Sequence, residues 1–313
     1  MADSTEGDTD LYLLVPALIA LLAGLMIHSF IIGVNVTNWW KGRPVTPVDH
    51  IVTSLGISRM FAQCVITVFL FVIRLLSNLN SNVPLAIGAV YIFFLYANVW
   101  LTSLLSIVFC LKISNFHSRL FLYLRGMIAH RTVYFIVAAV LLSALNCLMP
   151  IFTAITDWMR SGTYNTTIPD QCIEYTNTKY AYSYAIGASI PLIFYCISSF
   201  LLFTSLYHHT RKMKMSNNLS INLETYYSVM KFISFTFIYS TIYFFGHFIS
   251  VTFYFIYCIS LNWLYIVLNI LPVLHSSYLI YKTAKLRSKM YKVFQNVMYS
   301  FFKRENSETR ENI

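Results

Sequence analysis

The chain alternates long apolar stretches with short polar connections, and seven of the stretches are long enough to cross a bilayer. A helix needs about 20 residues to span roughly 30 Å of hydrocarbon. The predicted spans are 11–39, 48–76, 84–111, 132–156, 181–207, 229–257 and 261–281. Apolar–polar alternation in blocks of about ten residues, which marks a membrane barrel, is absent. Because only helices and closed barrels span membranes, the pattern predicts an all-α membrane protein with a seven-transmembrane helix bundle.

A further periodic segment follows the last span. Apolar residues recur at helical spacing, with basic residues between them: Leu286, Met290, Val293, Phe294, Val297 and Phe301 against Lys285, Arg287, Lys289 and Lys292. Such a segment lies in the membrane interface with its apolar face in the lipid and its basic face toward anionic headgroups. We expect a short amphipathic eighth helix on the inner leaflet.

Composition supports a membrane protein and argues against a nucleic-acid binder. Hydrophobic residues make up 58% of the 313 residues and charged residues only 11%, against about 25% charged residues in soluble domains. The net charge of +10 would suit a nucleic-acid ligand only if the basic residues formed a stripe on a soluble domain. They punctuate apolar runs instead, so no nucleic-acid partner is expected, and the solvent for most of the chain is lipid.

The basic residues fall in alternate connections, which predicts the orientation. One set holds Lys41, Arg43, Lys112, Arg119, Arg125, Arg131, Arg211, Lys212, Lys214, Lys231 and the tail from Lys282 to Arg310. The opposite set holds only Arg160 and Lys179, together with an acidic head. Basic residues are retained on the cytoplasmic side. We expect an extracellular N-terminus (1–10), a seven-transmembrane domain (11–281) and a cytoplasmic tail with the amphipathic helix (282–313), in a multi-pass plasma-membrane protein.

The connections are predicted to be short, with three exceptions. These are an outer loop over 157–180 and inner loops around 114–131 and 208–227. The first ten residues contain no Lys or Arg, so the first apolar run is expected to stay as a signal anchor rather than to be cleaved. The sequon Asn165-Thr166-Thr167 in the outer loop is a candidate glycosylation site.

Arg59 lies near the middle of the second span, where an arginine costs between about 2.5 and more than 10 kcal/mol. It must face the bundle interior. No Asp or Glu lies within a span, Asp49 being at the inner end of the second. We therefore expect neutral partners: backbone carbonyls, Ser54 or Ser58, and Asn35. A structural or conformational-switch role is favoured over ligand contact. Arg74, near the outer end, either snorkels to the interface or supplies a cation at the rim of a ligand pocket.

Catalytic and metal-binding patterns are absent from the sequence. His28, His247 and His275 lie singly in apolar runs, with no second ligand one turn away. The six cysteines form no CxxC pair, and paired carboxylates, HExxH and GxSxG do not occur. We expect no cofactor, no metal and no enzymatic activity.

Local motifs resemble those of the type 2 (bitter) taste receptors, a family of G-protein-coupled receptors. The end of the first span, Val34-Asn35-Val36-Thr37-Asn38-Trp39, resembles the family's Val-Asn-x-x-Asp-Trp, with Asn38 in place of Asp. Asp49 to Arg59 is similar to Asp-Gln-Ile-Leu-x-x-Leu-Ala-x-Ser-Arg, the most specific match. Further similarities are Trp100 to Phe116, Pro191, Ser205 to His209, Pro272 to Ser276, and Lys285 to Arg287. The resemblance covers all spans except the fourth.

The resemblance implies a receptor that binds small organic molecules from the extracellular side and activates a heterotrimeric G protein. The expected ligand contacts are Tyr91, Leu95, Tyr184, Tyr243, His247, Tyr265 and Arg74. The expected structural or switch residues are Asn35, Arg59, Pro191, Pro272 and His275, and the expected G-protein-facing residues are Lys112, Ile113, His208, His209, Arg211 and Lys212.

The ligand positions depart from the family's pattern. Tyr91 and Leu95 stand where many members have Trp and Asn, and an acidic position high on the seventh helix falls near Tyr265. A ligand ammonium would find no carboxylate in the spans, and an unpaired buried charge is unfavourable. We therefore expect a preference for neutral, aromatic or anionic compounds.

Other functions remain as alternatives. A vomeronasal type 1-like pheromone receptor fits less well at Leu111-Lys112-Ile113 and Ser58-Arg59. A small membrane transporter or channel would show flux without a G protein, but no inverted repeat and no intramembrane acid supports it. The expected partners are a small-molecule ligand, a heterotrimeric G protein and the lipid bilayer, with homo- or hetero-oligomers possible.

Overall fold

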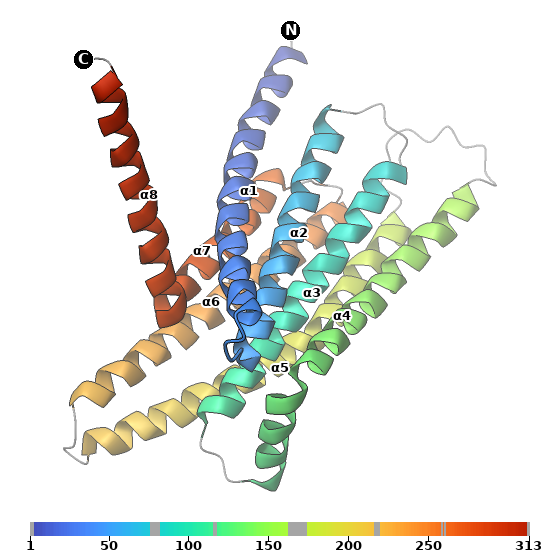
Figure 1. The fold of residues 1–313 in the computed structure, drawn as a ribbon. Coiled ribbons are helices and arrows are strands. Elements are labelled where there is room, and N and C mark those ends of the chain that lie inside the picture. Colours follow the sequence, from blue (N-terminus) through green and yellow to red (C-terminus); the bar gives the residue numbers. More distant parts are fainter. Residues whose placement is uncertain are drawn as a thin grey trace.

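The computed structural model describes residues 3–75, 82–114, 118–161, 174–215, 220–257, 259 and 261–311, and these residues are almost entirely helical. The helices are α1 (Asp3–Trp40), α2 (Pro47–Leu75), α3 (Asn82–Ile113), α4 (Arg119–Ser161), α5 (Glu174–Met215), α6 (Ser220–Tyr257), α7 (Asn262–Lys282) and α8 (Ala284–Glu311). Helices α1 to α7 each contain a stretch long and apolar enough to cross a membrane. The predicted seven-helix bundle with an additional amphipathic helix is confirmed (Figure 1).

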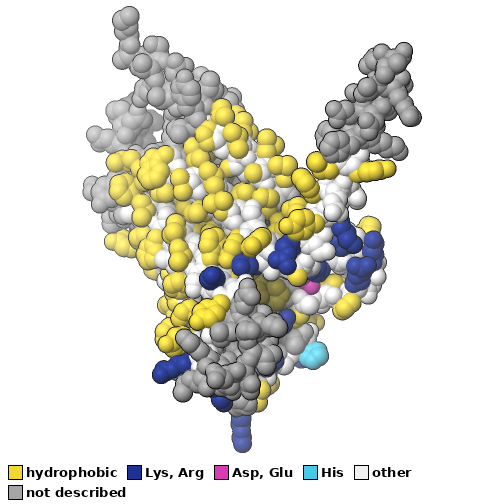
Figure 2. Space-filling model, turned by 90° about the vertical axis from the view of Figure 1, so that its left-hand side faces the viewer, with side chains coloured by type: hydrophobic (Ala, Val, Ile, Leu, Met, Phe, Trp, Pro, Cys, Tyr) yellow, Lys and Arg dark blue, Asp and Glu magenta, His cyan; other side chains and the backbone are white. Residues whose placement is uncertain are grey.

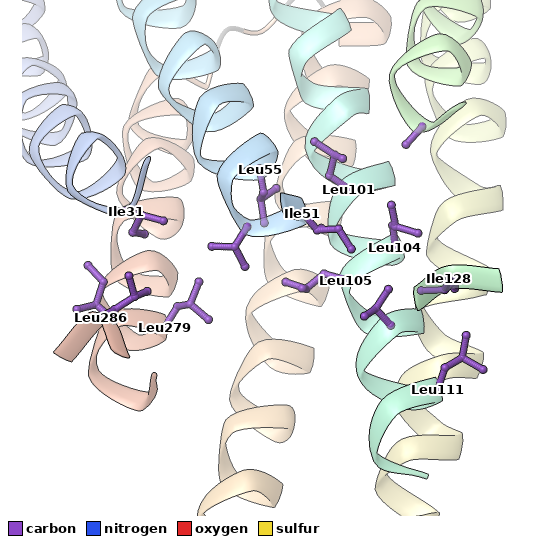
Figure 3. Packing of buried hydrophobic residues seen from close by; sticks show 14 residues of the cluster. Ile31, Ile51, Leu55, Leu101, Leu104, Leu105, Leu111, Ile128, Leu279 and Leu286 are labelled. Atoms are coloured by element: carbon purple, nitrogen blue, oxygen red, sulfur yellow. The ribbon is translucent and has the colours of Figure 1, made fainter. Parts of the chain in front are cut away.

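The bundle is organised around α3, which packs against α2, α4 and α5. Helix α1 packs against α2 and α7, and α6 lies between α5 and α7. The largest core cluster lies toward the end of α3 that carries Lys112 (Figure 3). It joins Ile51 and Leu55 of α2 to Leu101 and Leu105 of α3, and reaches Leu286 of α8.

All three predicted long loops are wrong in their extent. Residues 157–161 and 174–180, expected in the outer loop, belong to α4 and α5. Residues 208–215 and 220–227, expected in a loop, continue α5 and α6, and residues 119–130 form the first turns of α4. The reason is local: the stretch from His208 to Met215 has no Gly or Pro and contains Arg, Lys and Met, which are good helix formers. Arg131 has non-helical backbone angles (φ −120°, ψ 25°) and divides α4. The membrane span of α4 is His130–Leu148, which starts two residues before the predicted span 132–156 and ends eight residues before its end.

The surface of the bundle is suited to lipid. Large apolar side chains are exposed on its outside, among them Leu22, Tyr134 and Phe200. Figure 2 shows a broad hydrophobic surface with Lys and Arg side chains gathered below it. Soluble monomers rarely expose apolar patches of more than a few hundred Å². The exposed hydrophobic side chains therefore face the bilayer rather than water.

Helix α8 is held to the bundle at its beginning only. Leu286 is 3% exposed within the core cluster, whereas Val293, Phe294 and Val297 are exposed. The helix then diverges from the bundle and runs toward the same end of the molecule as the N-terminus, so the expected position across the inner ends of the helices is wrong (Figure 1). Within its apolar stripe Leu286 and Met290 pack against the core, and the later residues Val293, Phe294 and Val297 are exposed, which fits an apolar side that contacts lipid.

The packing of α1 on α2 depends on a glycine. A Cβ atom at Gly24 would clash with Oε1 of Gln63, a side chain that is 2% exposed. The Nε2 of Gln63 donates a hydrogen bond of 2.8 Å to the carbonyl of Asn269 on α7. Small residues at helix contacts allow this kind of close approach in membranes.

We predict that Gly24→Ala displaces Gln63 and breaks its bond to α7, lowering the free energy of unfolding by about 1–3 kcal/mol. The measurement is the thermal unfolding midpoint of the purified protein in detergent. Gly33→Ala is the matched control on the same helix, because a Cβ there meets nothing within 4 Å. Equal stability of the two variants would contradict the close-packing argument.

Candidate functional site

A buried aromatic cluster lies in the half of the bundle away from Lys112. Leu95 of α3, Tyr184 of α5 and Tyr243 of α6 belong to one apolar cluster. The His247 ring packs edge-on against Tyr243 at 4.5 Å between centroids, and its Nδ1 lies 3.5 Å from the Tyr91 hydroxyl. Most of the predicted ligand residues, taken from three helices, are thus brought together.

The remaining two predicted ligand residues are Tyr265 and Arg74. Tyr265 on α7 lies close enough to Tyr91 for their hydroxyl groups to interact electrostatically. Arg74 belongs to α2, but its side chain lies outside the described residues.

The aromatic cluster carries unused hydrogen-bonding capacity. The Tyr184 hydroxyl and the Nε2 of His247 are buried and have no hydrogen-bond partner within the described part of the chain. A pocket that is mostly apolar with a few convergent polar atoms is the usual form of a small-molecule site. The aromatic cluster has the residue composition of such a site.

A second cluster surrounds the Arg59 guanidinium, which is 2% exposed. One of its nitrogens lies 2.9 Å from Nδ1 of His275 and donates to Oγ of Ser276 at 3.0 Å. Its Cζ lies 5.6 Å from the centre of the Tyr239 ring, which stacks on His275 at 4.4 Å. Because arginine only donates, Nδ1 of His275 must accept, so this imidazole is neutral with its proton on Nε2. The cluster ties α2 to α6 and α7.

Arg59 faces the bundle interior and has neutral partners, as predicted, but Asn35 and Ser58 are not among these partners. Asn35 instead donates to Oγ1 of Thr53 at 3.0 Å, and Ser58 donates to the carbonyl of Phe94 on α3 at 3.3 Å. Successive residues of a helix point about 100° apart. Ser58 therefore faces α3 while Arg59 faces α7. Of the other predicted switch residues, His275 belongs to the cluster, and Pro191 and Pro272 lie inside α5 and α7.

The two clusters are joined along one face of α6. Tyr239, Tyr243 and His247 are four residues apart, so their side chains stack one above another. The Tyr239 and Tyr243 rings are 5.8 Å apart, and Tyr243 contacts His247. We call this row the α6 ladder. It connects the aromatic cluster to the partners of Arg59.

The predicted G-protein-facing residues gather at the ends of α3 and α5. Lys112, His208, Arg211 and Lys212 are exposed, and Ile113 and His209 are half-buried. Ile113 packs against a cluster that includes Leu206 of α5 and Ile233 of α6. This packing holds the two basic helix ends beside each other.

Two contacts of Asp49 at the Lys112 end of the bundle were not predicted from the sequence. Thr46 and Asp49 cap α2 reciprocally: Asp49 Oδ2 accepts from the Thr46 N–H at 3.0 Å, and Thr46 Oγ1 accepts from the Asp49 N–H at 3.2 Å. Asp49 also pairs with Lys285 of α8 at 3.0 Å. The spacing Thr46-Pro47-x-Asp49 is a capping-box pattern and could have revealed the cap.

Lys282 makes a further contact of this kind, donating to the Ser228 hydroxyl at 3.0 Å. It joins the end of α7 to α6. The sequence offers no signal for this bond, because it depends on how the two helices lie side by side. The candidate glycosylation site Asn165 lies outside the described residues.

The family model and the relatives that match this chain belong to one family. A model of the family described as "Taste receptor protein (TAS2R)" matches residues 6–298. The chain is 27% identical to rat taste receptor type 2 member 104 over 230 residues, which are 72% of this chain and 75% of the relative. It is 33% identical to macaque taste receptor type 2 member 9 over 202 residues, 62% of this chain and 63% of the relative.

The Arg59 cluster generates a prediction about two adjacent serines. Ser276→Ala removes a buried hydrogen bond to a charged group and should lower the free energy of unfolding by about 1.5–3 kcal/mol. Ser277→Ala is the control, because that hydroxyl bonds only to the carbonyl of Val273 in its own helix. Thermal unfolding in detergent measures both. A fall for Ser277→Ala as large as that for Ser276→Ala would refute the assignment.

Proposed function

The chain belongs to the taste receptor protein family, and we propose that it is a bitter taste receptor that binds small organic molecules from the extracellular side and activates a heterotrimeric G protein. Family membership supports the general activity. The observation that supports the mechanism is the α6 ladder. Its residues Tyr239, Tyr243 and His247 join the candidate ligand site to the cluster around Arg59.

The proposed ligand site is the aromatic cluster formed around Tyr91, Leu95, Tyr184, Tyr243 and His247, with Tyr265 beside it. Its walls are aromatic and aliphatic, so ligand affinity comes mainly from burial of apolar surface. The unpaired atoms of Tyr184 and His247 orient the ligand by hydrogen bonds. The spans contain no carboxylate to pair with an ammonium group. The preferred ligands are therefore neutral or anionic aromatic compounds.

Activation is a shift between two packings of α6 and α7. A ligand that contacts Tyr243 and His247 changes the position of the ladder. Tyr239 then changes its stacking on His275, and the partners of Arg59 are rearranged. A ligand shifts such an equilibrium only by its difference in affinity for the two states, and moving it from 1:99 to 99:1 takes about 5.5 kcal/mol. This is within reach of a well-packed small molecule.

The cytoplasmic response arises at the helix ends that carry Lys112, Ile113, His208, His209, Arg211 and Lys212. Movement of α6 alters the contact of Lys282 with Ser228 and the packing of Ile113. The surface between α3 and α5 then becomes available to the G protein. In this orientation the N-terminus is extracellular, and α8 begins on the cytoplasmic side beside the end of α7.

Receptor activity is tested by calcium release in cells that carry a promiscuous G protein, using a broad set of aromatic compounds. Tyr91→Ala and Tyr265→Ala should change potency by about tenfold (about 1.4 kcal/mol), and differently for chemically unrelated agonists. Arg59→Ala should change surface level or basal signalling for every agonist alike. A response to an agonist that persists without a G protein would favour a transporter or channel. If Arg59→Ala abolished the response to one agonist alone, Arg59 would be a ligand contact and the proposed ligand site would be wrong.

Orientation is tested through the sequon at Asn165. If the connection between α4 and α5 is extracellular, Asn165 passes through the secretory lumen and can carry a glycan. Deglycosylation should shift the electrophoretic mobility of the wild type, and Asn165→Gln should show no shift. A wild-type band whose mobility is unchanged by the enzyme would show that the sequon carries no glycan. A glycan on a sequon engineered into the α3–α4 connection would show that this connection is lumenal, and the proposed orientation would then be wrong.

A further inference from the structure

A cavity lies beside the Arg59 guanidinium, between α2, α3, α5 and α6. Arg59, Asn98, Thr102, Tyr195, Tyr239 and Tyr243 are among its lining residues. About 30 Å³ of it is wide enough to take the centre of a water-sized sphere. A single water needs about 10–15 Å³ by the same measure. The cavity therefore has room for a small ion with a water molecule, but not for an organic ligand.

The cavity contains a polar side chain whose hydrogen-bonding capacity is largely unused. Asn98 is 3% exposed, and neither atom of its amide makes a hydrogen bond of good geometry to the described residues. The Tyr243 hydroxyl, which also lines the cavity, interacts with this amide without completing its hydrogen bonds. Buried amides in native proteins are nearly always hydrogen-bonded, so an orphan that faces a cavity points to an occupant.

The charge of Arg59 indicates what the occupant is. An arginine stays protonated even when buried, and the sequence places no Asp or Glu between 50 and 156 or in the later spans. The contacts of Arg59 are a neutral imidazole, a hydroxyl and an aromatic ring. These groups provide dipoles but no opposite charge. Water in the cavity would leave the guanidinium uncompensated, whereas an anion would neutralise it.

We propose that this cavity is a binding site for a monovalent inorganic anion of halide size, such as chloride, held by the Arg59 guanidinium and the Asn98 amide N–H. The Tyr243 hydroxyl is a further donor beside it. The anion favours the conformation in which these three groups converge. Because Tyr239 and Tyr243 belong to the α6 ladder, occupancy of the site biases the position of α6.

The test is the thermal unfolding of the purified full-length protein in detergent at constant pH and ionic strength. Chloride is replaced stepwise by gluconate, which is too large for the cavity. A thiol-reactive dye reports unfolding through the free cysteines Cys110 and Cys147, which are buried. The midpoint should rise with chloride and saturate, and bromide should substitute for chloride. A midpoint that is the same in gluconate and in chloride overturns the proposal.

Two asparagine variants separate the site from a general salt effect. Asn98→Leu keeps the side-chain size and removes the donor, so the chloride dependence should disappear. Asn269→Leu is the matched control: its Nδ2 is also buried without a partner, but Asn269 does not line the cavity. Chloride dependence that persists in Asn98→Leu, or is lost in Asn269→Leu, contradicts the assignment.

A direct measurement on the wild type keeps the proposal falsifiable if Asn98→Leu does not fold. A structure determined in bromide should show anomalous scattering within hydrogen-bonding distance of Arg59. The absence of such a peak at this position overturns the proposal. Its result does not depend on ligand activation, so the anion site and the proposed receptor function fail separately.

Discussion

One buried cation organises the interior of this protein. Arg59 cannot reach water from the middle of α2, and no carboxylate is available in the spans, so its charge must be satisfied by neutral groups on other helices. His275 and Ser276 supply these groups from α7, and Tyr239 supplies its ring from α6. The relative positions of three helices are thereby linked to one guanidinium. A movement of any of them requires the others to give Arg59 a new set of partners.

Outside this cluster the bundle is held by apolar packing and by contacts between helix ends. The core in Figure 3 anchors Leu286 of α8, and the capping box of α2 holds Asp49 where it can pair with Lys285. This ion pair is half-exposed and contributes at most about 1 kcal/mol. It fixes the starting direction of α8 rather than the stability of the bundle. The polar centre therefore links α2, α6 and α7, whereas the anchored end of α8 attaches that helix to the bundle.

The seven spans could be predicted from the sequence because the bilayer imposes a length and a composition on each of them. Most of the predicted ligand residues also lie together. Of these, Tyr91 and Leu95 share one face of α3 because they are four residues apart, and Asn98 follows at i+7 on the same face. The same periodicity could have identified Asn98 as a residue of this face. The partners of Arg59 could not be read in this way. They depend on the rotation of α2 about its axis, and a rotation of one residue moves a side chain by about 100° from one neighbour to another.

The charge of Arg59 also bears on which molecules the aromatic cluster accepts. Two unit charges about 10 Å apart interact by about 1.7 kcal/mol at an effective dielectric constant of about 20, which is more than tenfold in affinity. The ladder places aromatic rings between Arg59 and the proposed ligand site. Without a counter-ion, the positive field of Arg59 disfavours cationic ligands and favours anionic ones. An anion beside Asn98 would remove this field, so neutral aromatic compounds would then be bound for their shape alone. Selectivity for ligand charge and occupancy of the buried anion site are therefore two consequences of the same unpaired arginine.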